Sequence, residues 1–299
     1  MDDVSATVLE EALAEATTAL ERASAHAQVS VRPVTGTGEL AAMETLLARV
    51  WQHPPGSVEV DVTMLAALAR SGNYVAGAFR RGDDEPGDGE ELVGATVGFR
   101  GEPFPVTLHS HVTGVGTSRS LPGTGSALKA HQRVWCLQRG ITAVRWTVDP
   151  LQARNARLNI GRLGADWVGF VPDYYGDLRD GLNADVGSDR LLLQWDLTRL
   201  AADRDAERAA AAAATTQGEG TVLARGAAGE PVAGPVPTAY GRLEIPADID
   251  ALRATDPDLA RQWREALRTL LPGLISSGRR VIDFDENGAY VVAPGRAQP

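Results

Sequence analysis

The segment from residue 106 to residue 125 constrains the fold of this chain more than any other. It reads VTLHSHVTGVGTSRSLPGTG and predicts a strand, a short loop and the first turn of a helix. Side chains in a strand alternate between its two faces, so His109 and His111 should share one face with Thr107 and Thr113. The same alternation predicts that the opposite face carries Val106, Leu108, Ser110 and Val112.

A glycine-rich turn follows this strand. Gly114 and Gly116 loosen the backbone, and Pro122 stops it from continuing as a strand. The sequence Gly123-Thr124-Gly125-Ser126 then opens a helix predicted to run to about Arg139. The first amides of a helix lack intrahelical acceptors and lie at the positive end of its dipole, where phosphate groups bind. The turn therefore predicts a phosphate or pyrophosphate site, with a tight turn that binds nothing as the alternative.

The elements after the turn favour the functional interpretation. A strand over 141–148, the pair Asp149-Pro150 and a further helix complete a strand–helix–strand–helix unit. The run from Val115 to Leu128, with Asn155 and residues 158–165, resembles the acyl-CoA-binding core of the GNAT superfamily of N-acyltransferases. In that family the turn reads Gln/Arg-x-x-Gly-x-Gly/Ala, and the later helix ends in a motif like Leu-Tyr-x-x-x-Gly-Phe.

A narrower resemblance rests on three further segments. LHSHVTGV, TVDPLQARNARLN and YYGDLRDGLN are similar to a poorly characterised GNAT branch, some of whose relatives are linked to N-succinylation of amino acids. The GNAT-like part covers roughly residues 29–197, and the narrower match extends weakly into the C-terminal segment. The departures from the family motifs fall on Ser120, Pro122 and Asn159.

The resemblance implies an α/β (α+β) chain with the GNAT fold, a mixed and mostly antiparallel sheet flanked by helices. The local patterns agree, because one strand, two helices and two strands precede the segment at 106–125. We expect an N-terminal helix in 1–28, a GNAT-like acyl-CoA-binding domain in 29–198 and an Ala/Gly/Pro-rich connection in 199–239. A small α+β subdomain should occupy 240–299, with a hairpin turn at Asn287-Gly288.

Composition excludes several other classes. The 299 residues carry a net charge of −10, which disfavours a nucleic-acid or anionic-membrane partner. Cys136 is the only cysteine, so neither an internal disulfide nor a Cys-based zinc site is expected, and its helical position favours a buried filler. No ligand spacing for a metal is visible. The N-terminus lacks a signal pattern and no apolar run approaches ~18 residues, which predicts a cytoplasmic protein without membrane contact.

The resemblance also implies which residues hold acyl-CoA. The pyrophosphate would lie on the backbone amides of the turn, and pantetheine would pair with the strand backbone around Val115. The family's Gln/Arg falls on Ser120, so the side-chain anchor is either missing or shifted to Arg119, and Pro122 removes one amide donor. The predicted acyl-CoA-binding residues are Thr113, Val115, Arg119, Ser120, Gly123, Thr124, Gly125, Ser126 and Asn155.

The catalytic candidates follow from the same alignment of motifs. His109 falls where several GNAT enzymes carry a glutamate base, and imidazole titrates nearest neutrality, which suits removal of a proton from an ammonium. His111 is the second candidate, and the alternative is that one or both rings are core histidines. Asn159 stands where many members have a tyrosine that serves the leaving thiolate. Tyr174 or Tyr175 could replace that tyrosine, or the thiolate could leave unassisted.

The acceptor candidates are less specific. Arg145 and Arg190 could bind a carboxylate through a bidentate fork, and Arg145 is the better candidate because it shares a strand side with Asp149. Asp149 is either a substrate ligand or a helix cap, and Tyr175 is a further substrate-binding candidate. The expected reaction transfers an acetyl- or succinyl-class group from acyl-CoA to a small-molecule amine, such as an amino acid or natural-product intermediate.

Two alternatives to this activity stay open. One is a GNAT-shaped CoA-binding or regulatory module without turnover, and the other is a non-transferase reaction on an acyl-CoA, such as hydrolysis or decarboxylation. The sequence also leaves open a homodimer formed through the first helix and the last subdomain.

Overall fold

The computed structural model describes residues 3–52, 57–81, 90–116, 122–176, 187–215 and 220–295. The chain divides into two compact units, and the division falls within strand β5 (Ala143–Val148), after Arg145. Unit 1 comprises the described residues up to Arg145 together with 196–198. Unit 2 comprises the other described residues from Trp146 onward.

Unit 1 contains a mixed, mostly antiparallel sheet, as the sequence predicts. Its strands lie in the order β1 (Ser30–Pro33), β2 (Tyr74–Arg81), β3 (Glu90–Gly101), β4 (Thr107–Val115) and the first part of β5. Neighbouring strands from β1 to β4 are antiparallel. β4 and β5 are parallel, with register partners running from Thr107 and Ala143 to His109 and Arg145.

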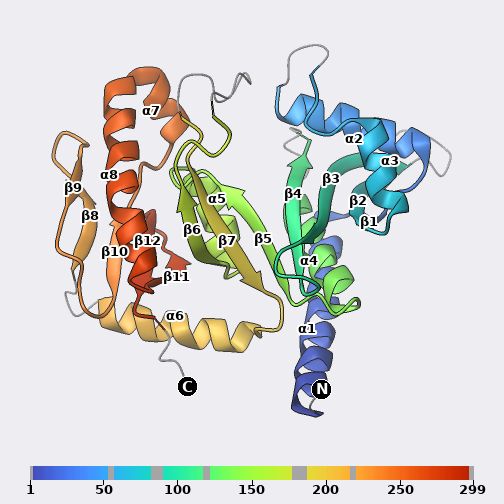
Figure 1. The fold of residues 1–299 in the computed structure, drawn as a ribbon, viewed down its shortest axis with the longest axis horizontal. Helices are drawn as coiled ribbons and strands as arrows, with labels where there is room; N and C mark the ends of the chain where they lie inside the picture. Colours follow the sequence, from blue (N-terminus) through green and yellow to red (C-terminus); the bar gives the residue numbers. More distant parts are fainter. Residues whose placement is uncertain are drawn as a thin grey trace. The chain divides into compact units, whose positions relative to one another are not determined.

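Helices cover both faces of this sheet (Figure 1). On one face lie α2 (Thr37–Val50) and α3 (Val62–Arg70), and on the other lie α1 (Asp3–Ala27) and α4 (Thr124–Leu137). The Asp61 carboxylate caps the start of α3 by accepting the amides of Thr63 and Met64. The predicted N-terminal helix and mixed α/β class are confirmed.

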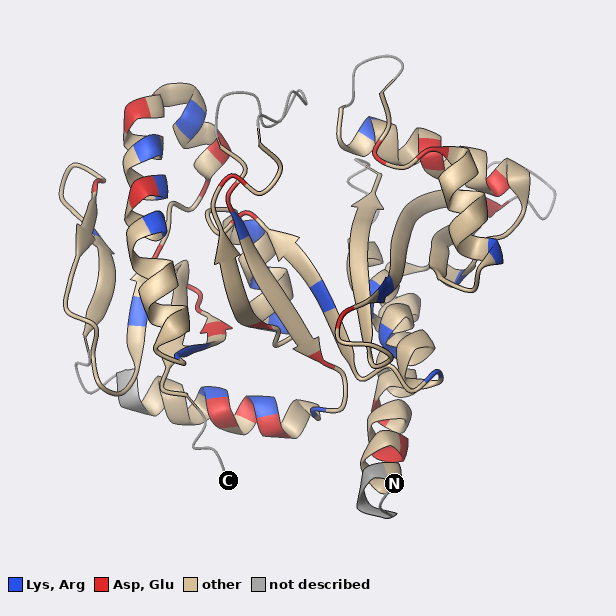
Figure 2. Cartoon of the chain, viewed as in Figure 1, with Lys and Arg blue, Asp and Glu red and all other residues tan. Residues whose placement is uncertain are grey.

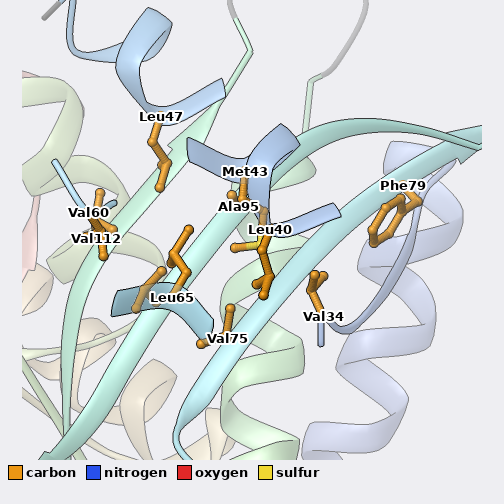
Figure 3. Packing of buried hydrophobic residues seen from close by; sticks show 11 residues of the cluster. Val34, Leu40, Met43, Leu47, Val60, Leu65, Val75, Phe79, Ala95 and Val112 are labelled. Atoms are coloured by element: carbon orange, nitrogen blue, oxygen red, sulfur yellow. The ribbon is translucent and has the colours of Figure 1, made fainter. Parts of the chain in front are cut away.

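Two apolar clusters hold these layers together. Figure 3 shows the first, in which side chains of α2 and α3 pack on the sheet. Its members include Leu40, Met43, Leu47, Leu65, Val75, Val97 and Val112. The second joins α1 and α4 to the opposite face through Ala27, Val29, Ala78, Val93, Ala127 and Leu128. Burial of one such large aliphatic side chain stabilises the fold by ~1.5–3 kcal/mol, so the helix positions are strongly determined.

A β-bulge in β4 changes the predicted strand faces. Val97 of β3 pairs with Val112, but its neighbour Gly98 pairs with Ser110, which leaves His111 as an extra residue. Val112 therefore joins the α2–α3 cluster, whereas the Ser110 hydroxyl bonds to side chains of α4. The prediction that these two residues share a face is wrong, because the bulge interrupts the alternation. A Cβ on Gly98 would lie 2.9 Å from the His109 carbonyl oxygen, so only glycine fits opposite the bulge.

Unit 2 begins with the rest of β5 and then α5 (Ala153–Ala156), which continues as the π-helix η1 (Arg157–Arg162). Strand β7 (Arg190–Asp196) lies between β5 and β6 (Asp166–Val171). The helix predicted after Asp149-Pro150 begins only at Ala153. The intervening residues form a turn in which the Asp149 carboxylate accepts the Leu151 amide at 2.9 Å.

The C-terminal residues form a second sheet with three helices. Its strand order is β11-β12-β10-β8-β9. The elements are α6 (Ala201–Thr215), β8 (Thr221–Arg225), β9 (Pro231–Ala233), β10 (Gly241–Glu244), α7 (Ile249–Thr255), α8 (Pro257–Ser276), β11 (Arg280–Phe284) and β12 (Ala289–Ala293). The predicted hairpin between β11 and β12 is confirmed, with Gly288 at φ +84°.

This second sheet belongs to the same unit as β6 and η1. The Val281 amide donates to Asp166 at 2.9 Å, and the Trp167 indole donates to the Arg279 carbonyl at 2.7 Å. The Tyr290 hydroxyl donates to the Pro150 carbonyl. These bonds tie the C-terminal segment to the end of the GNAT-like segment, while the predicted domain boundaries themselves stay predictions. Over the described ranges, none of the helices has the length and apolarity to cross a membrane.

Candidate active site

The two histidines predicted as base candidates lie together on β4. Their ring centroids are 6.2 Å apart, and both rings pack against Phe99 of β3, at 5.0 Å for His109 and 5.9 Å for His111. His109 is half-buried and His111 is exposed. Neither ring is sealed in the core, and the catalytic role of either histidine stays a prediction.

The surroundings of the two rings differ. Burial lowers the pKa of His109, and the nearby charges of His111 and Lys129 lower it further. At neutral pH the His109 imidazole is therefore uncharged and able to accept a proton. His111 lies at the bulge, with its Nε2 3.8 Å from a carboxylate oxygen of Glu59.

The start of α4 has the geometry expected of a phosphate-binding turn. Gly123 is the N-cap residue of the helix and adopts the left-handed conformation, with φ +90° and ψ −14°. The amides of Thr124, Gly125 and Ser126 form its first turn, where an α-helix has donors without intrahelical acceptors. Arg119 and Ser120, the predicted anchors, lie outside the described residues.

We expect Gly123→Ala to destabilise unit 1 by about 1–2 kcal/mol, because a non-glycine residue is strained at this φ. The added Cβ would also lie 2.9 Å from the His26 ring at the end of α1. Gly125→Ala is the matched control: its φ is ordinary, and its Cβ would meet only Val115, at 3.8 Å. Urea unfolding of both variants measures the difference, and equal stabilities would show that the turn does not require glycine.

The predicted residues on β4 and the neighbouring β5 lie close to the histidines in the ladder. Thr113 pairs with Thr96 of β3, and their hydroxyl oxygens are 2.9 Å apart. Val115 pairs with Gly94 and packs against the α1–α4 side. Arg145, the register partner of His109 on β5, donates to the Glu102 carbonyl at 3.2 Å. The roles predicted for these side chains stay predictions.

Two α4 side chains, His131 and Cys136, are packed in the interior, as the sequence predicts for Cys136. The His131 ring nitrogen lies 2.9 Å from the Tyr74 hydroxyl, and burial lowers the pKa of His131 to about 4. Cys136 is fully buried, and burial raises the pKa of its thiol to about 12, which leaves it unreactive at neutral pH.

Sequence reasoning missed a buried polar cluster on the other side of β4. The Lys129 ammonium donates to the Ser110 hydroxyl at 2.9 Å and to the Gln132 side-chain oxygen at 3.0 Å, and Gln132 donates to Ser110 at 3.2 Å. We call these three residues the Lys129 cluster. A signal was available, because Lys129 is the only lysine among 29 lysine and arginine residues.

The remaining predicted residues belong to unit 2. Asn155 is exposed on α5, whereas Asn159 is buried on η1. Tyr174 and Tyr175 are both exposed and stack edge to face, with centroids 4.6 Å apart. The Tyr175 hydroxyl lies 3.4 Å from that of Thr147, and the Arg190 guanidinium stacks on the Tyr175 ring at 5.0 Å. The structure thus brings Tyr174, Tyr175 and Arg190 together.

Asp149 links the end of β5 to the C-terminal helices. Its carboxylate accepts from Arg253 at 2.8 Å and from Arg264 at 3.2 Å. The N-cap of α5 is Gln152 and not Asp149, and the substrate-binding role of Asp149 stays a prediction. These partners follow Asp149 by 104 and 115 residues, which is why local sequence patterns could not reveal them.

The sequence matches no protein-family model and no curated protein. The structure is similar to an N-acetyltransferase from Staphylococcus aureus Mu50, at 14% identity and a TM-score of 0.43, covering 56% of this chain and 98% of that one. The structure is also similar to YncA from Salmonella typhimurium with its cofactor acetyl-CoA, at 15% identity and a TM-score of 0.45, covering 58% of this chain and 96% of that one.

A third similar structure is the ribosomal-protein-alanine N-acetyltransferase from Brucella melitensis, at 16% identity and a TM-score of 0.44, covering 56% of this chain and 99% of that one. Likenesses at this level do not establish a family for this chain. Among the residues that the structure describes, no group of three or more His, Cys, Asp or Glu side chains could hold a metal ion.

Proposed function

We propose that this chain is an acyl-CoA-dependent N-acyltransferase. More specifically, it transfers an acetyl- or succinyl-class group to the amine of a small molecule such as an amino acid. The observation that carries the proposal is the pairing of two features on one strand–turn–helix unit. β4 presents the uncharged, half-buried His109, and the same segment leads into the Gly123 turn at the start of α4.

The described residues fit acyl-CoA as the co-substrate. The first turn of α4 follows Gly123, and its Gly125 and Ser126 amides would donate to the pyrophosphate, because first-turn amides have no intrahelical acceptors. The acceptor ammonium must lose a proton before its nitrogen can attack the thioester carbonyl carbon. His109 takes that proton. The new C–N bond forms as the C–S bond breaks, and the electron pair of the C–S bond leaves on sulfur as the CoA thiolate. The nitrogen then loses its second proton to give the neutral amide, and the CoA thiolate takes up that proton.

Other roles in this reaction stay predictions. Arg145 and Arg190 are the candidates to bind an acceptor carboxylate, and Asn159 and Tyr174 are the candidates to assist the leaving thiolate. A cytoplasmic location and a homodimer also remain predictions.

The test is release of free CoA, followed with a thiol reagent. We expect the full chain to release CoA from acetyl-CoA or succinyl-CoA only when a suitable amine from an amino-acid panel is present. Calorimetry with CoA measures binding separately. Binding without thioester consumption would support a module without turnover, and release without any amine would support hydrolysis or decarboxylation.

A further inference from the structure

The Lys129 cluster lies beneath the strand that carries both histidines. Ser110 lies between His109 and His111 in the sequence, at the β4 bulge. Hydrogen bonds to the Ser110 hydroxyl therefore constrain the backbone that carries the two rings. The three side chains of the cluster are almost sealed from solvent, at 4% exposed for Ser110, 5% for Lys129 and 0% for Gln132. Their three hydrogen bonds form a closed triangle that joins α4 to β4.

We propose that Lys129 is a positioning residue, which acts through Ser110 to fix the β4 bulge and through its charge to keep His109 unprotonated. The inference rests on the proposed function, in which His109 is the base. An ammonium so close to β4 disfavours a second positive charge on the strand, which agrees with its contribution to the lowered pKa of His109.

The choice of lysine supports a functional role for this position. Every other strongly basic residue of the chain is an arginine, yet the one basic side chain inside this cluster is a lysine. A guanidinium keeps its charge at any physiological pH, whereas a buried ammonium can release its proton. Burial lowers the pKa of Lys129 to about 7. The charge beneath β4 therefore changes in the pH range in which acyl transfer to amines would operate.

The other charged and titratable side chains around His109 and Lys129 are the same in every variant of the test, except where Gln132 or Lys129 itself is replaced. His111 lies on the same strand, with Glu59 beside it, and Arg145 is the register partner of His109 on β5. Cys136 and His131 lie on α4, and Tyr74 bonds to His131. Arg100 follows Phe99 on β3. Because these groups are present in each variant below, a shift between variants reports Lys129 alone.

The test compares Lys129→Met with Lys129→Arg and Gln132→Leu in the full chain. We expect Lys129→Met to lower kcat about tenfold to a hundredfold at a similar KM, because small displacements of a base are costly. The acid limb of kcat/KM should also move to higher pH, since His109 loses a neighbouring positive charge. Lys129→Arg keeps the positive charge, so the acid limb of kcat/KM should stay at the wild-type pH. Gln132→Leu weakens the triangle without changing charge, so it should lower kcat without moving the limb.

NMR titration of the His109 imidazole, assigned with His109→Gln, gives a readout that needs no turnover. We expect the pKa of His109 to rise in Lys129→Met and to stay in Gln132→Leu. Loss of stability in Lys129→Met with an unchanged His109 titration would overturn the inference, because a merely structural lysine would behave so. If Lys129→Met does not fold, the same titration in Lys129→Gln decides, because glutamine removes the charge and can still bond to Ser110. An unchanged His109 pKa in that variant would overturn the inference. Absence of acyl transfer would refute the proposed function, and the titration would still decide whether Lys129 acts on His109.

Discussion

Replacing His109 with glutamine is expected to lower kcat/KM by about 100- to 10,000-fold, the usual contribution of a general base. Glutamine keeps much of the volume of the ring and can still donate a hydrogen bond, but it cannot accept a proton from an ammonium. The half-buried ring packs on Phe99, so the substitution should leave the fold intact. Circular dichroism and urea unfolding check that point, and CoA release with the best amine measures the rate.

His111→Gln is the matched control, because His111 lies on the same strand beside the same phenylalanine. We expect it to lower kcat/KM by less than tenfold. A larger loss in His111→Gln than in His109→Gln would assign the base to His111 instead. Unchanged turnover in both variants would remove the histidines from the mechanism.

The pH profile gives an independent check on His109. Because the pKa of His109 lies below the ordinary histidine value of about 6.5, the base stays unprotonated at neutral pH. In the wild-type chain kcat/KM should therefore fall only as the pH drops below about 6.5, through the pKa of His109. This acid limb should be lost in the residual activity of His109→Gln.

Much of unit 1 could be predicted from local patterns. Alternation predicted the strand β4, and helical periodicity predicted the two helices α2 and α3. The β4 bulge could not be predicted, because the sequence HSHV alternates as a regular strand would. The extra residue shows only in the pairing with β3, where Gly98 admits the His109 carbonyl.

The errors in the candidate site came from contacts between distant segments. Lys129 is the only lysine of the chain, but its burial against Ser110 depends on how α4 packs on β4, which sequence periodicity does not give. Asp149 looked like a local cap because its partners on α7 and α8 lie more than a hundred residues away. The roles of charged residues were therefore the hardest to predict where their partners lie far away in the sequence.

A network of carboxylates and arginines in unit 2 is the basis of the second prediction, which concerns the stability of that unit. It consists of Asp149, Asp173, Asp189, Arg253, Arg264 and Arg268. Basic and acidic segments alternate along α8, which contributes two of the arginines (Figure 2). Arg268 holds the Asp189 carboxylate through two hydrogen bonds, at 2.8 and 2.7 Å, and also reaches Asp173. The network thus ties α7 and α8 to the segments next to β5, β6 and β7.

We expect Asp189→Asn to destabilise unit 2 by about 3–5 kcal/mol at pH 7, because it removes one partner from a buried ion pair. The Asp189 side chain is 1% exposed, and its loss of charge removes a buried carboxylate from Arg264 and Arg268 at once, which leaves Asp149 beside Arg264 and Asp173 beside Arg268. Asp250→Asn is the control, since Asp250 pairs with Arg253 at the edge of the network with its side chain 64% exposed. We expect that variant to change stability by less than about 1 kcal/mol.

At acid pH the stability of the wild-type chain and that of Asp189→Asn should become more similar. Burial alone would raise the pKa of Asp189, but hydrogen bonds from Arg268 and the Asp173 amide, with the charge of Arg264, outweigh burial and lower it. A carboxylate with a lowered pKa stabilises the fold fully above the unfolded-state value of about 3.9, and this stabilisation is lost as the pH falls through the folded-state value. The wild-type chain should therefore lose its advantage below about pH 4. Hydrogen exchange in β6, β7 and α8 measures this for unit 2 alone, and a difference that persists undiminished at pH 3 would mean that Asp189 contributes through its shape rather than its charge.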